Sequence, residues 1–472
     1  MTADSQASLA EVAAPPQTAN PASASGISLF QLICYSLPAG STSLMIVPLI
    51  AVFPTIYQKY YGVPFEALGP ALLASRLLDA FLDPLTAYLS DKTKSRLGAR
   101  KPWMIAGALI SVVGVYFLFI PQGKPDAIYF FIWSTVVYVG WTLIAIPHNA
   151  WGAEMSGNYD ERSRIVTVSG MVGAVGGTLF FAAPILLPFD TEDITPEVMR
   201  VIGILAIVFV PVSVAFAVFF APTGQSVSTF DAGIFRSLRG LWNNPPFRVF
   251  LAIFALQGLA LGIYAGLLFP FTDAYLKIGE YFARITILAT VANFVSIPAW
   301  LWACNRYGKH VAWAVGSLTT NLVLIAYLFM TPGEAAYIPA LVVSVLFGLL
   351  SSCASVCYPS ILADIIDYGT LKTGANRAGS YFAVVLLVVK GTAAVGGGLA
   401  TALIGYFGFS AAEGAVNSDF ANFGILFTFI GLHTLLQMIA IPLIWRFPID
   451  RRRQTIIRKR IEQRAARAAR TV

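Results

Sequence analysis

The chain has 472 residues, of which 57% are hydrophobic and 12% are charged, and its formal net charge is +7. Its mean hydropathy of +0.72 excludes a water-soluble globular protein and predicts an all-α integral membrane protein. We assign the excess positive charge to membrane topology and to contact with anionic lipid head groups, so nucleic-acid binding is not expected.

Twelve apolar runs are long enough to cross a bilayer, because a hydrocarbon core about 30 Å thick needs about 20 residues of helix. The predicted helices span residues 27–58, 66–90, 103–121, 127–155, 165–188, 199–221, 247–275, 282–304, 311–331, 336–366, 380–407 and 420–446.

The segments outside these helices are short. Residues 1–26 are rich in Ala, Pro and Ser and lack the basic stretch of a signal peptide, so they predict a disordered cytoplasmic leader. Residues 222–246 form a polar central loop that joins a six-helix half at 27–221 to a second at 247–446, and residues 447–472 form a basic tail.

The distribution of basic residues predicts the orientation, because Lys and Arg favour the cytoplasmic side of short loops. They gather in the even-numbered connections, for example at Lys92 and Lys94 after the second helix, at Arg236 and Arg239 in the central loop, and along the tail. The fifth connection, DTEDITPE, is acidic. Both termini are therefore expected in the cytoplasm, and the protein in the cytoplasmic (inner) membrane.

The second predicted helix carries charge where a membrane helix is usually apolar. Asp79 and Asp83 are one turn apart and share a face, and Arg76 precedes Asp79 by three residues, so the three form one polar stripe. Two close carboxylates in a low dielectric repel each other, so the pair should hold a cation or share a proton. The alternative is a passive brace in which basic groups neutralise both acids.

A lysine lies inside the eleventh predicted helix. Lys390 follows a long apolar run and cannot easily reach the membrane surface, so it needs a buried partner. We expect that partner to be the pair Asp79 and Asp83.

Two internal matches relate the halves. SRLGARKPW after the second helix resembles NRYGKHVAW after the eighth, and GAVGGTL in the fifth resembles AAVGGGL in the eleventh. Both matches are offset by six helices. This predicts the major facilitator fold, in which the substrate site lies between two six-helix halves near the midplane of the membrane.

Four stretches, SRLLDAFLDP, SRLGARKPW, IPHNAWGAE…YDERSR and LADIIDYGTLKTGANRAGSYF…VVKG, resemble the glycoside-pentoside-hexuronide:cation symporters, the melibiose-permease-like branch of the major facilitators. The resemblance runs from about residue 30 to about residue 440. It implies that Asp79 and Asp83 bind the coupling Na⁺ or H⁺, with Lys390 close by.

The resemblance also implies a charged cytoplasmic gate, whose groups pair across the halves when the transporter faces outward and separate when it faces inward. Its members follow the second, fourth and tenth helices: Asp91, Arg96, Gly98, Arg100, Lys101, Asp160, Glu161, Arg162, Arg164, Asp364, Asp367, Tyr368, Lys372 and Arg377. The alternative is that these are ordinary solvated loop charges.

The chain departs from melibiose-type members at the sugar site. Those members use an aspartate on the first helix and another on the fourth, where this chain has Ser41, Thr42 and Ser43 and, on the fourth, Ala145. A galactoside would lose charge-assisted hydrogen bonds here, so a plain galactoside is not expected. The missing acid on the fourth helix also favours H⁺ slightly over Na⁺.

Aromatic rings with amide, imidazole and hydroxyl groups remain available for a glycoside or uronide ring. The candidates are Tyr35, Ser43, His148, Asn149, Trp151, Gln257 and Tyr264. For each of them the alternative is ordinary packing between helices.

Together these features predict a cation-coupled symporter of a small polar solute that works by alternating access and functions as a monomer. The alternatives are an amphipathic lysolipid-like substrate and a non-transporting receptor or scaffold. No Gly-Lys-Ser/Thr phosphate loop is present and the three histidines are far apart, so we expect no enzyme, no cofactor and no metal site beyond Na⁺ at Asp79 and Asp83.

Overall fold

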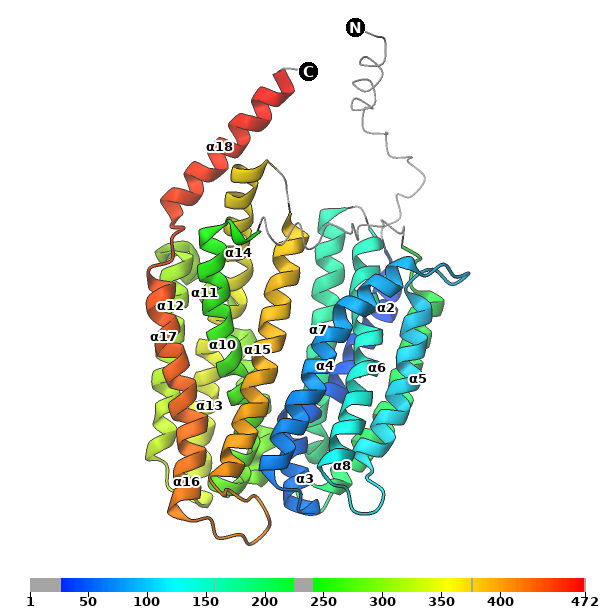
Figure 1. The fold of residues 1–472 in the computed structure, drawn as a ribbon, viewed down its shortest axis with the longest axis vertical. Helices are drawn as coiled ribbons and strands as arrows, with labels where there is room; N and C mark the ends of the chain where they lie inside the picture. Colours follow the sequence, from blue (N-terminus) through cyan, green and yellow to red (C-terminus); the bar gives the residue numbers. More distant parts are fainter. Residues whose placement is uncertain (1–26, 157, 225–240, 375–376, 471–472) are drawn as a thin grey trace.

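The computed structural model describes residues 27–156, 158–224, 241–374 and 377–470, and within them the chain forms helices joined by short turns (Figure 1). The predicted leader at 1–26 and most of the central loop, with Arg236 and Arg239, lie outside the described residues.

The helices fall into two groups in chain order. The first half contains α2 (Leu29–Ala51), α3 (Phe53–Tyr61), α4 (Phe65–Lys92), α5 (Lys101–Phe119), α6 (Ala127–Glu154), α7 (Tyr159–Leu186) and α8 (Pro196–Phe220). The second half contains α10 (Pro245–Pro270), η2 (Phe271–Tyr275), α11 (Phe282–Tyr307), α12 (Lys309–Ile325), α13 (Tyr337–Ser351), α14 (Cys353–Thr373), α15 (Ala378–Tyr406), α16 (Asp419–Leu426), η6 (Phe427–Leu432) and α17 (His433–Trp445). The basic helix α18 (Arg451–Arg470) follows.

In the described part of the chain, 11 segments are long and apolar enough to cross a membrane. The twelfth crossing is α4, which packs among them but is less apolar because Arg76, Asp79 and Asp83 lie at its centre. The predicted twelve-helix membrane fold is confirmed.

Two predicted helices are interrupted. The first breaks at Val52, because Pro54 lacks the N–H that would continue the helix and lies instead in the first turn of α3. The tenth breaks at Ser352, between α13 and α14. Its second part runs to Thr373, well beyond the predicted end at 366.

Several groups expected in loops lie in helices. Asp160 to Arg164 form the first turns of α7, which begins at Tyr159, and Asp367 to Lys372 lie in the last turns of α14. The basic tail is helical as well. Its Ile457 is buried in the apolar core of the second half, and α18 packs against α14.

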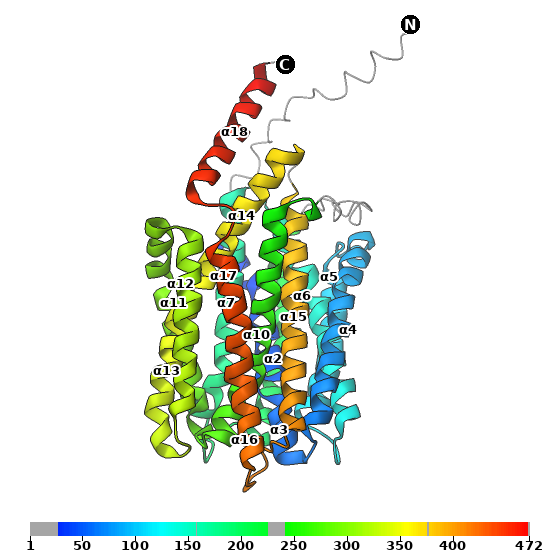
Figure 2. The same cartoon turned by 60° about the vertical axis from the view of Figure 1, so that its left-hand side comes forward.

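The two halves meet mainly along α4 with α15, α7 with α11 and α2 with α10, and α3 also contacts α10 (Figures 1 and 2). Figure 1 shows the connection from α4 to α5 and helix α18 at one end of the bundle, here called the terminal end. The opposite end carries α3 and the connection from α5 to α6, and η2 lies beside α3, because Asp273 pairs with Lys59.

Small residues allow α4 and α15 to approach closely. A Cβ on Gly398 would lie 2.6 Å from the Cβ of Leu73, and a Cβ on Gly69 would lie 2.3 Å from the backbone nitrogen of Ala402. Both distances are shorter than real contacts between such atoms, so these glycines are required where the halves touch.

We expect Gly398→Ala to lower the stability of the folded protein by about 1–3 kcal/mol, because the added methyl group overpacks the contact between α4 and α15. The melting temperature of the purified protein in detergent measures this change. Gly391→Ala on the same helix is the matched control, since a Cβ there meets no atom within 4 Å. Equal melting temperatures for the two variants would contradict the close approach.

Candidate functional site

The charged centre of α4 faces a lysine from the other half. Lys390 on α15 places its Nζ 2.6 Å from Asp83 Oδ2 and 3.8 Å from Asp79 Oδ2. Asp79 is buried, with 6% of its surface exposed. The structure therefore brings together the three groups that the sequence singled out, and the ammonium group of Lys390 occupies the position of a cation beside two carboxylates.

The sequence reasoning missed two further members of this centre, both on α6. The hydroxyl of Thr142 donates a hydrogen bond to Asp79 and lies 3.3 Å from Asp83 Oδ1. The ring of Trp141 lies 4.4 Å from Lys390 Nζ, within range of a cation–π contact. Thr142 adds a third oxygen-bearing side chain to the two carboxylates, which makes the centre a cluster of hard oxygen ligands.

Arg76, placed in the same stripe by sequence, has a different partner. Its Nε donates to the hydroxyl of Tyr138 on α6 at 2.9 Å. Within the described residues no carboxylate lies in ion-pair distance of Arg76. The passive arrangement in which Arg76 neutralises one aspartate is therefore not the one seen here.

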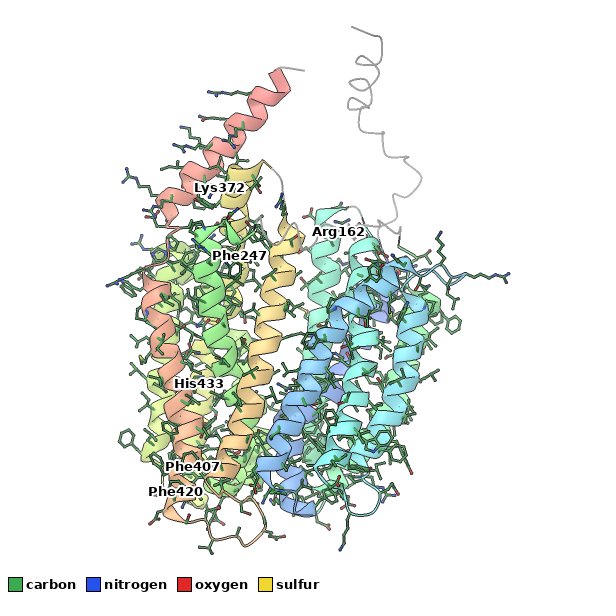
Figure 3. The ribbon with its side chains drawn as sticks, in the orientation of Figure 1. Arg162, Phe247, Lys372, Phe407, Phe420 and His433 are labelled. Carbon is green, nitrogen blue, oxygen red and sulfur yellow. The ribbon has the colours of Figure 1, made fainter. Side chains whose placement is uncertain are left out.

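A large cavity lies between the two halves. Its volume is about 1330 Å³, and it is lined by α2, α6 and α7 of the first half and by α10, α11, α13 and α15 of the second. It extends from Arg162, which Figure 3 labels near the terminal end, towards Phe181 and Leu268. Arg162 is the one charged side chain among the described residues that line it.

The ion pair lies on the same face of α15 as the cavity wall. Phe382 and Leu386 line the cavity, and Lys390 follows Leu386 by four residues, so the three share one face. The cavity and the charged centre are therefore adjacent along this helix.

Four of the predicted substrate residues line this cavity. Tyr35 and Ser43 on α2, Asn149 on α6 and Tyr264 on α10 contribute to its wall. Gln257 lies elsewhere, in a smaller recess within the second half. The cavity thus has hydroxyl, amide and aromatic groups on both sides.

Two other predicted substrate residues are engaged in helix packing. The ring of His148 stacks on Tyr35 with centroids 4.2 Å apart, and its Nε2 lies 2.7 Å from the carbonyl oxygen of Tyr35. The indole of Trp151 is buried, and its Nε1 donates to the carbonyl of Pro222 at 3.0 Å. Neither side chain lines the cavity in this structure, so their contact with substrate stays a prediction.

The charged groups at the terminal end pair within each half. Arg100 binds Asp91 and Glu154, with 2.6 Å to Glu154 Oε1, and Lys309 binds Asp364 at 2.7 Å. Glu154 and Lys309 were not among the predicted gate residues. Among the described residues no ion pair at this end joins one half to the other.

Several of the remaining gate candidates make contacts within their own half. Glu161 accepts a hydrogen bond from the backbone of Ile27 at 2.7 Å, and Arg162 donates to the carbonyl of Ser156 at 2.5 Å. Lys101 turns into the first half and donates to the carbonyl of Val218, and Lys372 donates to the carbonyl of Asn243. Gly98 has a positive φ of 92°, which glycine adopts without strain. For the other members, the gate role stays a prediction: Arg96, Asp160, Arg164, Asp367, Tyr368 and Arg377.

Ion pairs do join the halves at the opposite end. Lys59 on α3 lies 2.9 Å from Asp273 Oδ1 on η2. The pKa of the nearby Asp193 lies above its ordinary value because burial disfavours the charged carboxylate, and the positive charge of Lys59 offsets only part of this rise. Lys59 therefore pairs with Asp273 and also favours the charged form of Asp193, and its loss would remove this positive charge from both carboxylates.

Further contacts at this end also cross between the halves. Arg284 on α11 pairs with Glu192 from the first half. Gln58 donates to Ser410 Oγ and accepts from the backbone N–H of Ala411, both at 2.8 Å. The halves are thus held together at the opposite end, while the cavity reaches the terminal end.

Most of the chain is similar to known membrane transporters. A family model described as "MFS/sugar transport protein" matches residues 34–451. The inner membrane symporter YicJ of Escherichia coli (strain K12) is 24% identical over 83% of this chain and 86% of its own length. The isoprimeverose transporter of Lactiplantibacillus pentosus is 24% identical over 68% of this chain and 69% of its own length.

A relative with a different named substrate is the sodium-dependent lysophosphatidylcholine symporter 1 of Mus musculus, 23% identical over 81% of this chain and 79% of its own length. Among solved structures, the nucleoside transporter NupG aligns with a TM-score of 0.62 at 13% identity, covering 89% of this chain and 98% of the other. At this identity the likeness concerns the fold alone.

We expect Lys59→Met to open the opposite end, because the carboxylates of Asp273 and Asp193 then repel each other. The measurement is labelling of Ser43→Cys in the central cavity by a membrane-impermeant thiol reagent added at the opposite end. The four native cysteines are buried, so their background is low. The labelling of Cys at position 43 should be several-fold greater in the variant that also carries Lys59→Met than in the variant that carries Ser43→Cys alone.

The matched control for this experiment is Lys124→Met, an exposed lysine in the connection from α5 to α6 at the same end. It should leave labelling unchanged. Unchanged labelling in Lys59→Met as well would show that the ion pairs at this end do not hold it closed.

Proposed function

Because the chain belongs to the MFS/sugar transport protein family, we propose that it is a symporter in which H⁺ or Na⁺ binding at Asp79 and Asp83 drives the uptake of a glycoside, sugar or uronide. Its relatives are transporters and not enzymes. The proposal requires a coupling ion and a solute, and no further cofactor.

The observation that carries this proposal is the ion pair between the halves. Lys390 belongs to the second half, and the carboxylates that it neutralises belong to the first. A cation that enters between Asp79 and Asp83 takes over the role of the ammonium group and frees Lys390. Occupancy of the site therefore changes an interaction across the surface along which the halves must move, which is what coupling requires.

The chemistry of this centre suits either ion. Na⁺ needs several oxygen ligands, and the two carboxylates with the Thr142 hydroxyl supply them. H⁺ needs only one carboxylate, and protonation of Asp83 would weaken its attraction for Lys390 directly. Arg76, held by Tyr138, is proposed to position α4 and not to bind the ion.

The proposed substrate site is the central cavity. Its wall includes Tyr35, Ser43, Tyr264 and Asn149. The hydroxyl of Tyr35 donates to the carbonyl of His148 at 2.7 Å, so we propose Ser43, Tyr264 and Asn149 as the hydrogen-bonding partners of a sugar and the ring of Tyr35 as part of the wall. No carboxylate lines it among the described residues. His148 and Trp151 enter the proposal as positioning residues, since His148 holds the ring of Tyr35.

The orientation follows from the basic residues in the connections at the terminal end, which we propose lies in the cytoplasm. The structure then corresponds to a state that is open inward, with the ion pairs of Lys59 and Arg284 closing the outer end. The proposed outward-facing state breaks these pairs. It forms new ones at the inner end, where Arg162, Asp367 and Lys372 are exposed or half-buried.

A lysolipid-like substrate is the second candidate. The same cavity carries apolar side chains, such as Val47, Phe294 and Leu386, along which an acyl chain fits, and the mouse relative is named for such a substrate. A sugar is preferred because of the family description and the isoprimeverose transporter. The non-transporting alternative conflicts with the named functions of these relatives.

We expect Asp83→Asn to abolish accumulation of the solute, because an amide cannot exchange Lys390 for a cation. Exchange of labelled for unlabelled solute across the membrane should persist. Uptake into proteoliposomes under an imposed Na⁺ or pH gradient measures both, and the gradient that drives uptake identifies the ion. The matched control is Asp126→Asn, an exposed N-cap of α6 where asparagine caps equally well. Full accumulation by Asp83→Asn would overturn the coupling proposal.

We expect Thr142→Val to raise the cation concentration needed for half-maximal solute binding by about tenfold, because the variant removes one hydroxyl from the charged centre. Thr142→Ser keeps the hydroxyl and should behave like the unaltered protein. Titration of solute binding against Na⁺ and against pH gives the measurement. Equal values for the Val and Ser variants would exclude Thr142 from the ion site.

A further inference from the structure

The second half contains a polar recess that is separate from the ion pair. Its volume is about 400 Å³, and it lies among α10, α12, α13, α14, α15 and α17. We call it the second-half recess and define it by Gln257, Ser317, Asn321, Tyr358, His433 and Gln437. Figure 3 labels His433 on α17, within the second half. A volume of this size falls in the range of sites for small molecules.

The recess has an ordered wall of neutral polar groups. The hydroxyl of Tyr358 donates to Gln257 Oε1 at 2.5 Å, and Gln257 Nε2 lies 3.3 Å from Gln437 Oε1 and 3.4 Å from Ser317 Oγ. Hydrogen bonds between these side chains fix the direction of the amides. The wall is therefore preorganised to donate and accept hydrogen bonds.

Two buried polar atoms in this wall have no partner within the described residues, Asn321 Oδ1 and His433 Nδ1. Asn321 is 1% exposed and His433 is 3% exposed. A buried polar atom without a hydrogen bond costs free energy, and such atoms in a folded protein usually meet water or a ligand. Both residues line the recess, so a bound group with hydroxyls would satisfy these two atoms once their side chains turn towards it.

The recess borders the central cavity. Tyr264, Phe347 and Ser351 line both spaces. The rings of Tyr264 and Phe347 are stacked with centroids 4.3 Å apart, and they present an aromatic surface at the junction. The described lining of the recess contains no Asp, Glu, Lys or Arg, so it offers nothing to pair with a charged ligand.

We propose that the second-half recess binds one neutral glycosyl ring of a substrate that has at least two rings, while the other ring occupies the central cavity. This inference rests on the proposed function and specifies its substrate class. The hydroxyls of the ring in the recess would bond to Asn321, His433 and Gln437, and the apolar face of this ring would lie near Tyr264. A one-ring substrate would leave these buried groups unsatisfied and would bind more weakly.

The test compares ligands of one and two rings on the full-length purified protein, by calorimetry in the presence of Na⁺ and at several pH values. The probes are methyl pyranosides, which have one ring, and the corresponding disaccharides. At least one disaccharide should bind more tightly than its one-ring counterpart. Gln437→Leu and Asn321→Leu should each weaken the disaccharide by about tenfold and leave the one-ring ligand unchanged.

The matched control is Thr319→Val on α12. Thr319 lies between Ser317 and Asn321 in the sequence but does not line the recess. It should leave both affinities unchanged. Because Asn321 is buried and its variant could fold poorly, the half-buried Gln437 is tested as well, with thermal unfolding recorded for each.

The outcomes separate the two proposals. Disaccharide binding that is unaffected in both recess variants, or one-ring ligands that bind as tightly as disaccharides, would overturn the recess and leave sugar transport standing. A recess that holds only water gives this result. Binding of lysolipids with no binding of any sugar would instead overturn the proposed function itself.

Discussion

The ion pair between Lys390 on α15 and Asp79 with Asp83 on α4 imposes the main constraint on this molecule. A charge near the middle of a membrane helix is costly unless it is paired, and here the partners lie on different halves. The two helices must therefore approach closely, which explains why glycines occupy positions 69 and 398. Removing one partner of such a pair leaves a buried uncompensated charge. The two carboxylates are consequently stable in the membrane only with a positive charge beside them, either the ammonium group of Lys390 or a cation that replaces it.

The other contacts between the halves are unequally distributed. Lys59, Arg284 and Gln58 hold the opposite end together, whereas the ion pairs described at the terminal end stay within one half. The pair of Arg284 with Glu192 is partly exposed, and such pairs contribute only about 0–1 kcal/mol. Lys59 and Asp273 are largely buried, so breaking their pair is costly unless each group gains water or a new partner. An exchange in which every charged group gains such a partner changes the free energy little. The two access states can then be close in energy. A cation that alters the central pair can shift their balance, because that pair joins α4 of the first half to α15 of the second.

The sequence predicted the twelve crossings and the three charged residues of the centre, because each charge is an anomaly in an apolar run. It could not predict Thr142 or Tyr138, since hydroxyl groups are common in membrane helices and the rotation of α6 decides what they face. His148 is the reverse case. Its chemistry suggested a ligand, but its position against Tyr35 satisfies the imidazole. The breaks at Val52 and Ser352 depend on local backbone geometry that hydropathy does not detect.

The absence of carboxylates from the described walls of the central cavity has a consequence for recognition. A carboxylate that bound sugar hydroxyls would also attract the coupling cation and compete with Asp79 and Asp83 for it. Neutral hydroxyl and amide groups avoid this competition, but each hydrogen bond they make is weaker than a charge-assisted one. Comparable affinity then requires more hydrogen bonds over a larger ligand surface. The central cavity and the second-half recess together offer that surface, and the stacked rings of Tyr264 and Phe347 line the boundary between them.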